Sequence, residues 1–218
     1  HGDAQANIDT ASITFSPLTL EIDNLKLQGN LTGRNLRNNP QLSGHINSNT
    51  FNLRKLLAAN GKPLNLKNKN ALTQLQITAD LSASPEKITL KTLTGTLDGQ
   101  ALSGGLDYVL SSNPSLNFVL KMAELQIENY IPSNAASESS HSTKEGRRSE
   151  SSTSLAVNGS LTFERLEYGN YLLSSVKTTL SYSSKQLSIR NFTAGIFGGT
   201  TAGNMSINFI GGAPAFAI

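Results

Sequence analysis

The chain has 218 residues, no cysteine and a formal net charge of +3. The absence of cysteine excludes a disulfide framework, a thiolate nucleophile and a cysteine-ligated metal site. Lys and Arg are scattered singly, apart from the adjacent pairs Arg54–Lys55 and Arg147–Arg148, and form no basic stripe with interleaved aromatic residues, so we expect no nucleic-acid partner.

The first part of the chain has the period of a β-sheet. Apolar and polar residues alternate, which predicts strands with one dry and one wet face. From Leu18 to Ile22 the apolar residues keep one phase, and from Leu25 to Leu31 they take the other. We therefore expect a turn or bulge at Asp23 and Asn24.

One short segment departs from this alternation. Leu53, Leu56 and Leu57 have helical spacing, and the segment ends on Asn60 and Gly61, a suitable helix C-terminus. We predict one short helix near 51–59.

After this helix the sequence predicts a meander of strands joined by tight turns. Asp98 and Gly99 form the clearest turn, because Asp-Gly between alternating apolar residues is a strong hairpin signal. The expected strands cover 75–81, 88–97, 102–110 and 116–122.

The composition divides the chain into three parts. The first sheet half with the helix spans 1–132 and closes with a turn or helical elbow at 127–132. Residues 133–154 are rich in serine and hold no large apolar residue, so burial cannot offset the entropy of ordering them, and we predict a flexible linker or loop. The second sheet half spans 155–218.

The two halves contain a repeated hairpin. The segment from Ile88 to Tyr108 aligns without a gap with the segment from Leu187 to Ile207, at a constant offset of 99 residues. Thr94, Gly99 and Gly104 meet Thr193, Gly198 and Gly203 as identities, and apolar residues meet apolar residues between them. We predict that both segments fold as the same β-hairpin.

Catalytic and metal-binding patterns are absent from the sequence. His1 is terminal, His141 lies in the serine-rich segment, and His45 stands alone on an expected polar face. Carboxylates lie in turns or on wet faces, with no acid-base or metal spacing. We expect neither an enzyme nor a cofactor nor a metal.

The dry face of the strands needs a cover, because about twenty large apolar side chains are worth about 1.5 to 3 kcal/mol each when buried. The sheet could fold over on itself, meet a partner or hold an apolar ligand. We expect an all-β fold in which repeated antiparallel hairpins form a twisted, curled, groove-like sheet; a two-sheet sandwich is the alternative.

Several segments resemble the C-terminal region of the bacterial AsmA family. They are the short helix in "FNLRKLLAANGKPLN", the hairpin "LDGQALSG", the elbow "IENYIP" and the turn "GIFGGTTAG". The resemblance runs from about Ser16 to the end, interrupted by the serine-rich segment. Two features depart from the family pattern: Phe precedes Gly-Gly where the family often has Tyr, and the serine-rich segment is an insert.

The resemblance implies a periplasmic protein with a hydrophobic β-groove for lipid acyl chains, acting in outer-membrane biogenesis or phospholipid transport. No run of about 18 apolar residues occurs, so we interpret the chain as a fragment whose inner-membrane anchor lies outside it. The expected partners are phospholipid or another lipid, and envelope proteins. The expected groove lining is Leu75, Ile77, Leu81, Ile88, Leu90, Leu106, Tyr108, Phe118, Leu120, Val157, Leu161, Phe163, Leu180, Ile189, Met205 and Ile207.

Three other classes of protein compete with this reading. A non-catalytic envelope scaffold would act through its sheet edges. An adhesin would need a longer array of repeats. An outer-membrane barrel would need aromatic girdles, which a chain with 6% aromatic residues and no Trp does not supply.

Overall fold

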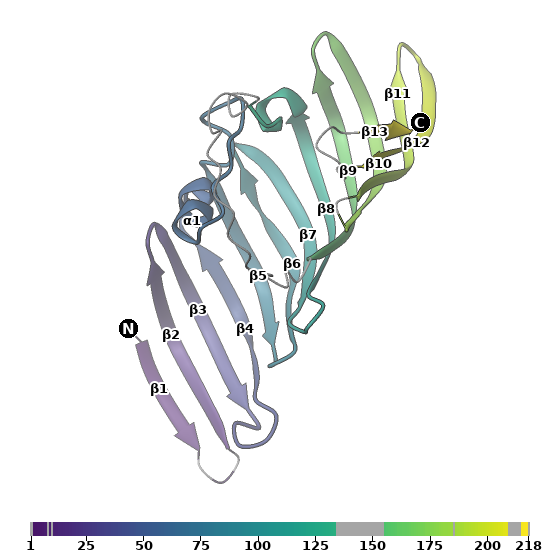
Figure 1. The fold of residues 1–218 in the computed structure, drawn as a ribbon. Helices are drawn as coiled ribbons and strands as arrows, with labels where there is room; N and C mark the ends of the chain where they lie inside the picture. Colours follow the sequence, from purple (N-terminus) through teal and green to yellow (C-terminus); the bar gives the residue numbers. More distant parts are fainter. Residues whose placement is uncertain are drawn as a thin grey trace, which may run out of the picture.

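The computed structural model describes residues 2–7, 9, 11–133, 155–184, 186–208 and 215–217. Its described residues form one sheet of 13 strands in sequence order, with β1 and β13 at opposite ends, so the sheet stays open. Figure 1 shows the long twisted sheet, with α1 beside the ends of β4 and β5. The strands are β1 (Gly2–Asn7), β2 (Ser12–Ile22), β3 (Leu25–Arg34), β4 (Gln41–Ser48), β5 (Leu75–Ala83), β6 (Lys87–Leu97), β7 (Gln100–Val109), β8 (Ser115–Gln126), β9 (Ala156–Tyr168), β10 (Tyr171–Ser183), β11 (Gln186–Ile196), β12 (Gly199–Asn208) and β13 (Ala215–Ala217).

The predicted all-β meander is therefore confirmed, and the molecule has a single sheet in place of the two-sheet sandwich. Among the described residues, every pair of elements in extensive contact consists of neighbouring strands, except that a short 3₁₀ helix also touches β9. That 3₁₀ helix, η1 (Ile127–Tyr130), occupies the expected elbow.

The predicted short helix is present as α1 (Leu53–Ala59). The side chain of Asn52 accepts a hydrogen bond from the backbone N–H of Lys55 at 2.9 Å, and so caps the helix N-terminus. Asn60 is the C-cap residue, and Gly61 follows with φ of 72°. Since α1 has no buried residue, it does not act as a lid on the sheet.

One strand pair departs from the antiparallel prediction. β8 and β9 are parallel, with Ser115 opposite Ala156 and Gln126 opposite Glu167. A parallel pair needs a long connection, because the chain must return the full length of a strand before it pairs again. The predicted linker at 133–154 belongs to this connection; nearly all of it lies outside the described residues, and its flexibility stays a prediction.

The repeated hairpin is confirmed at the level of register. In β6–β7, Leu90 is opposite Leu106, and a bulge precedes the pair Leu93–Gly104. In β11–β12, the corresponding pairs are Ile189–Met205 and Phe192–Gly203, with a bulge at the same place. The bulge residues Thr92 and Asn191 share a positive φ, 50° and 52°, so the two hairpins have one backbone design.

The two hairpins also share a two-residue turn with positive φ at both positions, the geometry of a type I′ turn. Asp98 and Gly99 have φ of 49° and 85°, and Phe197 and Gly198 have φ of 51° and 77°. Gly and Asn accept this left-handed conformation, whereas a Phe in it is strained, at a cost of about 1–2 kcal/mol.

We predict that Phe197→Asn raises the free energy of unfolding by about 0.5–1 kcal/mol, because Asn tolerates the left-handed region and Asn-Gly favours this turn. Urea unfolding followed by circular dichroism measures the change.

A substitution at the equivalent position of the first hairpin should destabilise the fold. Asp98→Ala should lower the free energy of unfolding by about 1–3 kcal/mol, because the Asp98 carboxylate accepts hydrogen bonds from three backbone N–H groups. A Phe197→Asn variant less stable than wild type would contradict the assignment of strain to this turn.

Candidate apolar binding face

The candidate site is one face of the sheet, where apolar residues line up across the strands. Residues opposite each other in neighbouring strands point to the same side, so the register defines rows. We call the first the Leu90 row; it runs from β2 to β12 without a break and consists of Phe15, Leu31, Gly44, Leu81, Leu90, Leu106, Phe118, Gly159, Leu180, Ile189 and Met205.

A second apolar row, the Tyr108 row, lies two residues along each strand from the first and is equally continuous. It consists of Ile13, Gly33, Leu42, Ala83, Ile88, Tyr108, Leu116, Val157, Tyr182, Leu187 and Ile207. Together the two rows make a band of apolar side chains across the sheet.

All the residues expected to line a groove lie on this face. Most belong to the two rows, and Leu75, Ile77, Leu120, Leu161 and Phe163 follow on the same face by alternation along their strands. Their role as a lipid groove stays a prediction.

The centre of the face is better packed than its band. The buried residues Leu93, Met122 and Val176 are 4%, 8% and 1% exposed. They belong to two clusters of apolar residues that meet at Leu102. The expected lining omitted these three residues, although their alternation with neighbouring strand residues could have indicated them.

The band itself is only half-buried. Leu81, Leu90, Leu106 and Phe118 have intermediate exposure, and Tyr182 is 37% exposed. No described element makes extensive contact across this face. The sheet therefore presents to its surroundings a long apolar surface that its own described residues leave open.

At one end of the strands a polar cluster fixes the connections. The Asp98 carboxylate accepts hydrogen bonds from the backbone N–H groups of Leu72, Thr73 and Gln74 and from the Tyr130 hydroxyl, at 2.7–3.1 Å. Burial, together with this carboxylate, raises the pKa of Tyr130. The sequence indicated Asp98 only as a turn residue, because its partners are distant in the chain.

The opposite face of the sheet is polar. Between the two apolar rows in sequence runs a row that consists of Thr14, Thr32, Ser43, Ser82, Thr89, Asp107, Asn117, Asn158, Ser181, Ser188 and Ser206. A shallow hollow of about 530 Å³ on this face includes Lys91, Asp107, Val119 and Ser160. The contrast between the two faces makes the sheet amphipathic along its length.

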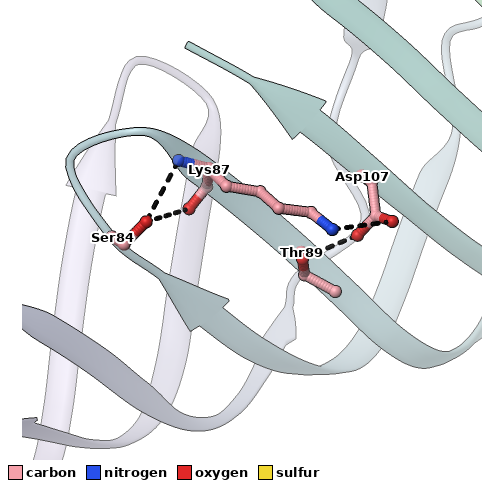
Figure 2. Close-up of polar contacts among 4 residues, drawn as sticks. All are labelled: Ser84, Lys87, Thr89 and Asp107. Carbon is pink, nitrogen blue, oxygen red and sulfur yellow. Dashed lines mark hydrogen bonds and ion pairs between the residues drawn. The ribbon is translucent and has the colours of Figure 1, made fainter.

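Polar contacts on this face are local and partly exposed. Figure 2 shows Asp107 with the Thr89 hydroxyl at 2.6 Å and the Lys87 ammonium at 3.1 Å. The hydrogen bond from Thr89 and the charge of Lys87 lower the pKa of Asp107. The Ser84 hydroxyl accepts a hydrogen bond from the backbone N–H of Lys87 and donates one to its carbonyl oxygen, which stabilises the turn before β6.

Of the three histidines, the structure describes only His45. The Nδ1 atom of His45 lies 2.9 Å from Asp80 on the polar face, as expected for a polar-face histidine, and both side chains are more than half exposed. No group of three His, Asp or Glu residues in the described part of the chain could hold a metal. None of its helices has the length and apolar character to cross a bilayer.

The chain matches no protein-family model, no curated protein and no solved structure. The resemblance to the AsmA family therefore rests on the sequence segments alone.

We predict that Asp107→Asn lowers the free energy of unfolding at pH 7 by less than about 1 kcal/mol, because its contacts are exposed. Since the pKa of Asp107 is lower in the folded than in the unfolded chain, its contribution is present above about pH 4 and is lost as the pH falls through the folded pKa. Urea unfolding should show a larger effect of Asp107→Asn at pH 7 than at pH 3.

Glu86→Gln, at an exposed position of the neighbouring turn, is the matched control and should change stability little at either pH. An effect of Asp107→Asn that is equal at both pH values would show that the carboxylate charge does not stabilise the fold.

Proposed function

We propose that this chain is a lipid-binding domain that holds acyl chains on the open apolar face of its sheet. The observation that carries the proposal is the pair of unbroken apolar rows on a sheet that has no second layer in its described residues. Half-buried leucine and phenylalanine side chains in such number favour a ligand or partner that removes them from water.

The length of the rows suits acyl chains. From β2 to β12 there are ten spacings of about 4.8 Å, which amount to about 48 Å. An acyl chain spans half of a hydrocarbon core of about 30 Å, or about 15 Å. The band can therefore accept more than one acyl chain along its length, and a chain can slide from one set of side chains to the next.

Acyl chains would move passively from water to the apolar face, driven by the burial of their CH₂ groups. A phospholipid has about thirty CH₂ groups, and each contributes about 0.8 kcal/mol when fully buried. An open face covers only one side of an acyl chain, so it stabilises the lipid less than a closed cavity does. Weak, distributed contact of this kind favours movement along the face and needs no catalytic residue or cofactor.

The cellular setting follows from the resemblance to the AsmA family. We infer a periplasmic domain of a Gram-negative envelope protein that is anchored in the inner membrane outside this chain and takes part in phospholipid movement or outer-membrane biogenesis. The one-sided sheet is consistent with the groove that the resemblance implies.

A structural scaffold is the second candidate, and one observation favours it. β1 is exposed along its whole length, and its outer edge has no strand partner among the described residues. Its sequence contains Asp3 as its only charged residue and no proline. An edge strand with a single charged residue and no proline can pair with a strand of another protein.

The test is lipid binding by the protein produced in a Gram-negative periplasm and purified without detergent. Native mass spectrometry should detect stoichiometric phospholipid on the wild-type chain. The Leu106→Asp, Tyr108→Asp variant should remain folded by circular dichroism and lose at least about tenfold in bound lipid, because two charges would lie in the acyl-chain path.

Val119→Asp is the matched control, because Val119 is next to Phe118 in sequence but lies 56% exposed on the polar face. It should retain lipid. A folded wild type without lipid would contradict the proposal and direct attention to the β1 edge. Loss of lipid only in Val119→Asp would place the ligand in the hollow of the polar face instead.

A further inference from the structure

The tips of two neighbouring hairpins expose large apolar side chains together. Phe197 is 86% exposed in the β11–β12 turn, and Tyr168, Tyr171 and Leu172 at the β9–β10 turn are 51%, 54% and 47% exposed. The rings of Tyr171 and Phe197 meet edge to face with centroids 6.1 Å apart. We call these four residues the aromatic tip; Figure 1 shows both turns at the same end of the strands.

The turn itself does not explain Phe197. The equivalent residue of the first hairpin is Asp98, which anchors backbone N–H groups and a tyrosine hydroxyl. Phe197 has the same left-handed backbone, with φ of 51°, and its side chain is almost fully exposed. A strained, exposed Phe at a turn where Asn or Gly would fit better indicates a role outside the fold.

The two turns that form the aromatic tip contain no charged residue, but carboxylates flank one of them. The sequence has no Asp, Glu, Lys or Arg between Tyr168 and Val176, and none between Phe192 and Asn208. Glu167 pairs with Leu172 across β9 and β10, and the Glu128 carboxylate lies near Gly169 in the β9–β10 turn. The β11–β12 turn with Phe197 can therefore enter an apolar medium first, and the flanking carboxylates favour a zwitterionic surface over an anionic one. Tyrosine is enriched at the membrane-water boundary, and Phe and Leu form the apolar side of segments that lie in that boundary.

The size of the aromatic tip favours a bilayer over a protein. An aromatic side chain has about 150–250 Å² of surface, so four side chains at these exposures offer less than about 600 Å². A stable protein interface uses about 800 Å² on each partner. A small tip of uncharged side chains fits the boundary of a lipid bilayer, which imposes no matching shape.

We propose that the aromatic tip inserts into the surface of a zwitterionic lipid bilayer and docks this end of the sheet on it. Leu173, next to Leu172, and Phe192, in the same hairpin as Phe197, pack against the apolar cluster of the open face, so the docked hairpins are continuous with that face. This inference goes beyond the lipid-binding proposal, since it concerns contact with a bilayer, and each can fail without the other.

A tryptophan reporter tests it directly, because the chain has no Trp of its own. We expect Phe197→Trp in the 218-residue chain to show a blue-shifted emission on addition of phosphatidylcholine and phosphatidylethanolamine vesicles. Brominated lipids in those vesicles should quench it. Val119→Trp, at an exposed apolar position in the middle of the polar face, should show neither effect.

Loss of binding must not reflect loss of fold. Phe197→Asn should reduce vesicle flotation at least tenfold while unfolding at equal or higher urea concentration than wild type. The Leu106→Asp, Tyr108→Asp variant should still float with vesicles, which separates docking from lipid held on the sheet. An unshifted Phe197→Trp emission, or flotation unchanged in Phe197→Asn, would overturn the proposal and leave the tip to a protein partner.

Discussion

Register between neighbouring strands is the constraint on which the rest of this structure depends. With no second layer in the described residues, apolar side chains are shielded mainly by their neighbours in the same row. A slip of one residue in any strand would turn its leucines to the polar face and interrupt both rows. The Leu90 and Tyr108 rows persist from β2 to β12 because every hairpin, bulge and turn between them keeps the same parity.

Bulges shift the alternation within a strand at defined places. An extra residue in one strand bends that strand and increases its local right-handed twist, and it changes the phase of the side chains that follow. At Thr92 and Asn191 the chain adopts a left-handed conformation, and the apolar phase shifts between Leu90 and Leu93 and between Ile189 and Phe192. Both phase shifts are visible in the sequence, because Leu90 and Leu93, and likewise Ile189 and Phe192, are three residues apart where strict alternation has two or four.

Local sequence signals predicted the strands and turns, whereas the pairing of strands distant in the sequence did not follow from them. Alternation, Asp98-Gly99 and the 99-residue repeat predicted the strands, the turn and the matching hairpins. The parallel pair of β8 and β9 has no local signal, since Ser115 meets Ala156 only after a long connection. The open state of the apolar face is also a property of the whole molecule, because alternation is the same under a second sheet and under water.

The parallel pair has a consequence for the symmetry of the molecule. β11 lies five strands after β6. If every pair between them were antiparallel, β11 would run opposite to β6, and the second hairpin would be related to the first by a half-turn. One parallel step cancels that inversion, so β11–β12 is related to β6–β7 by a shift along the sheet with rotation about one axis. The two ends of the strands are therefore different. One edge of the sheet holds α1, η1 and the two repeated turns, and the other edge holds connecting turns.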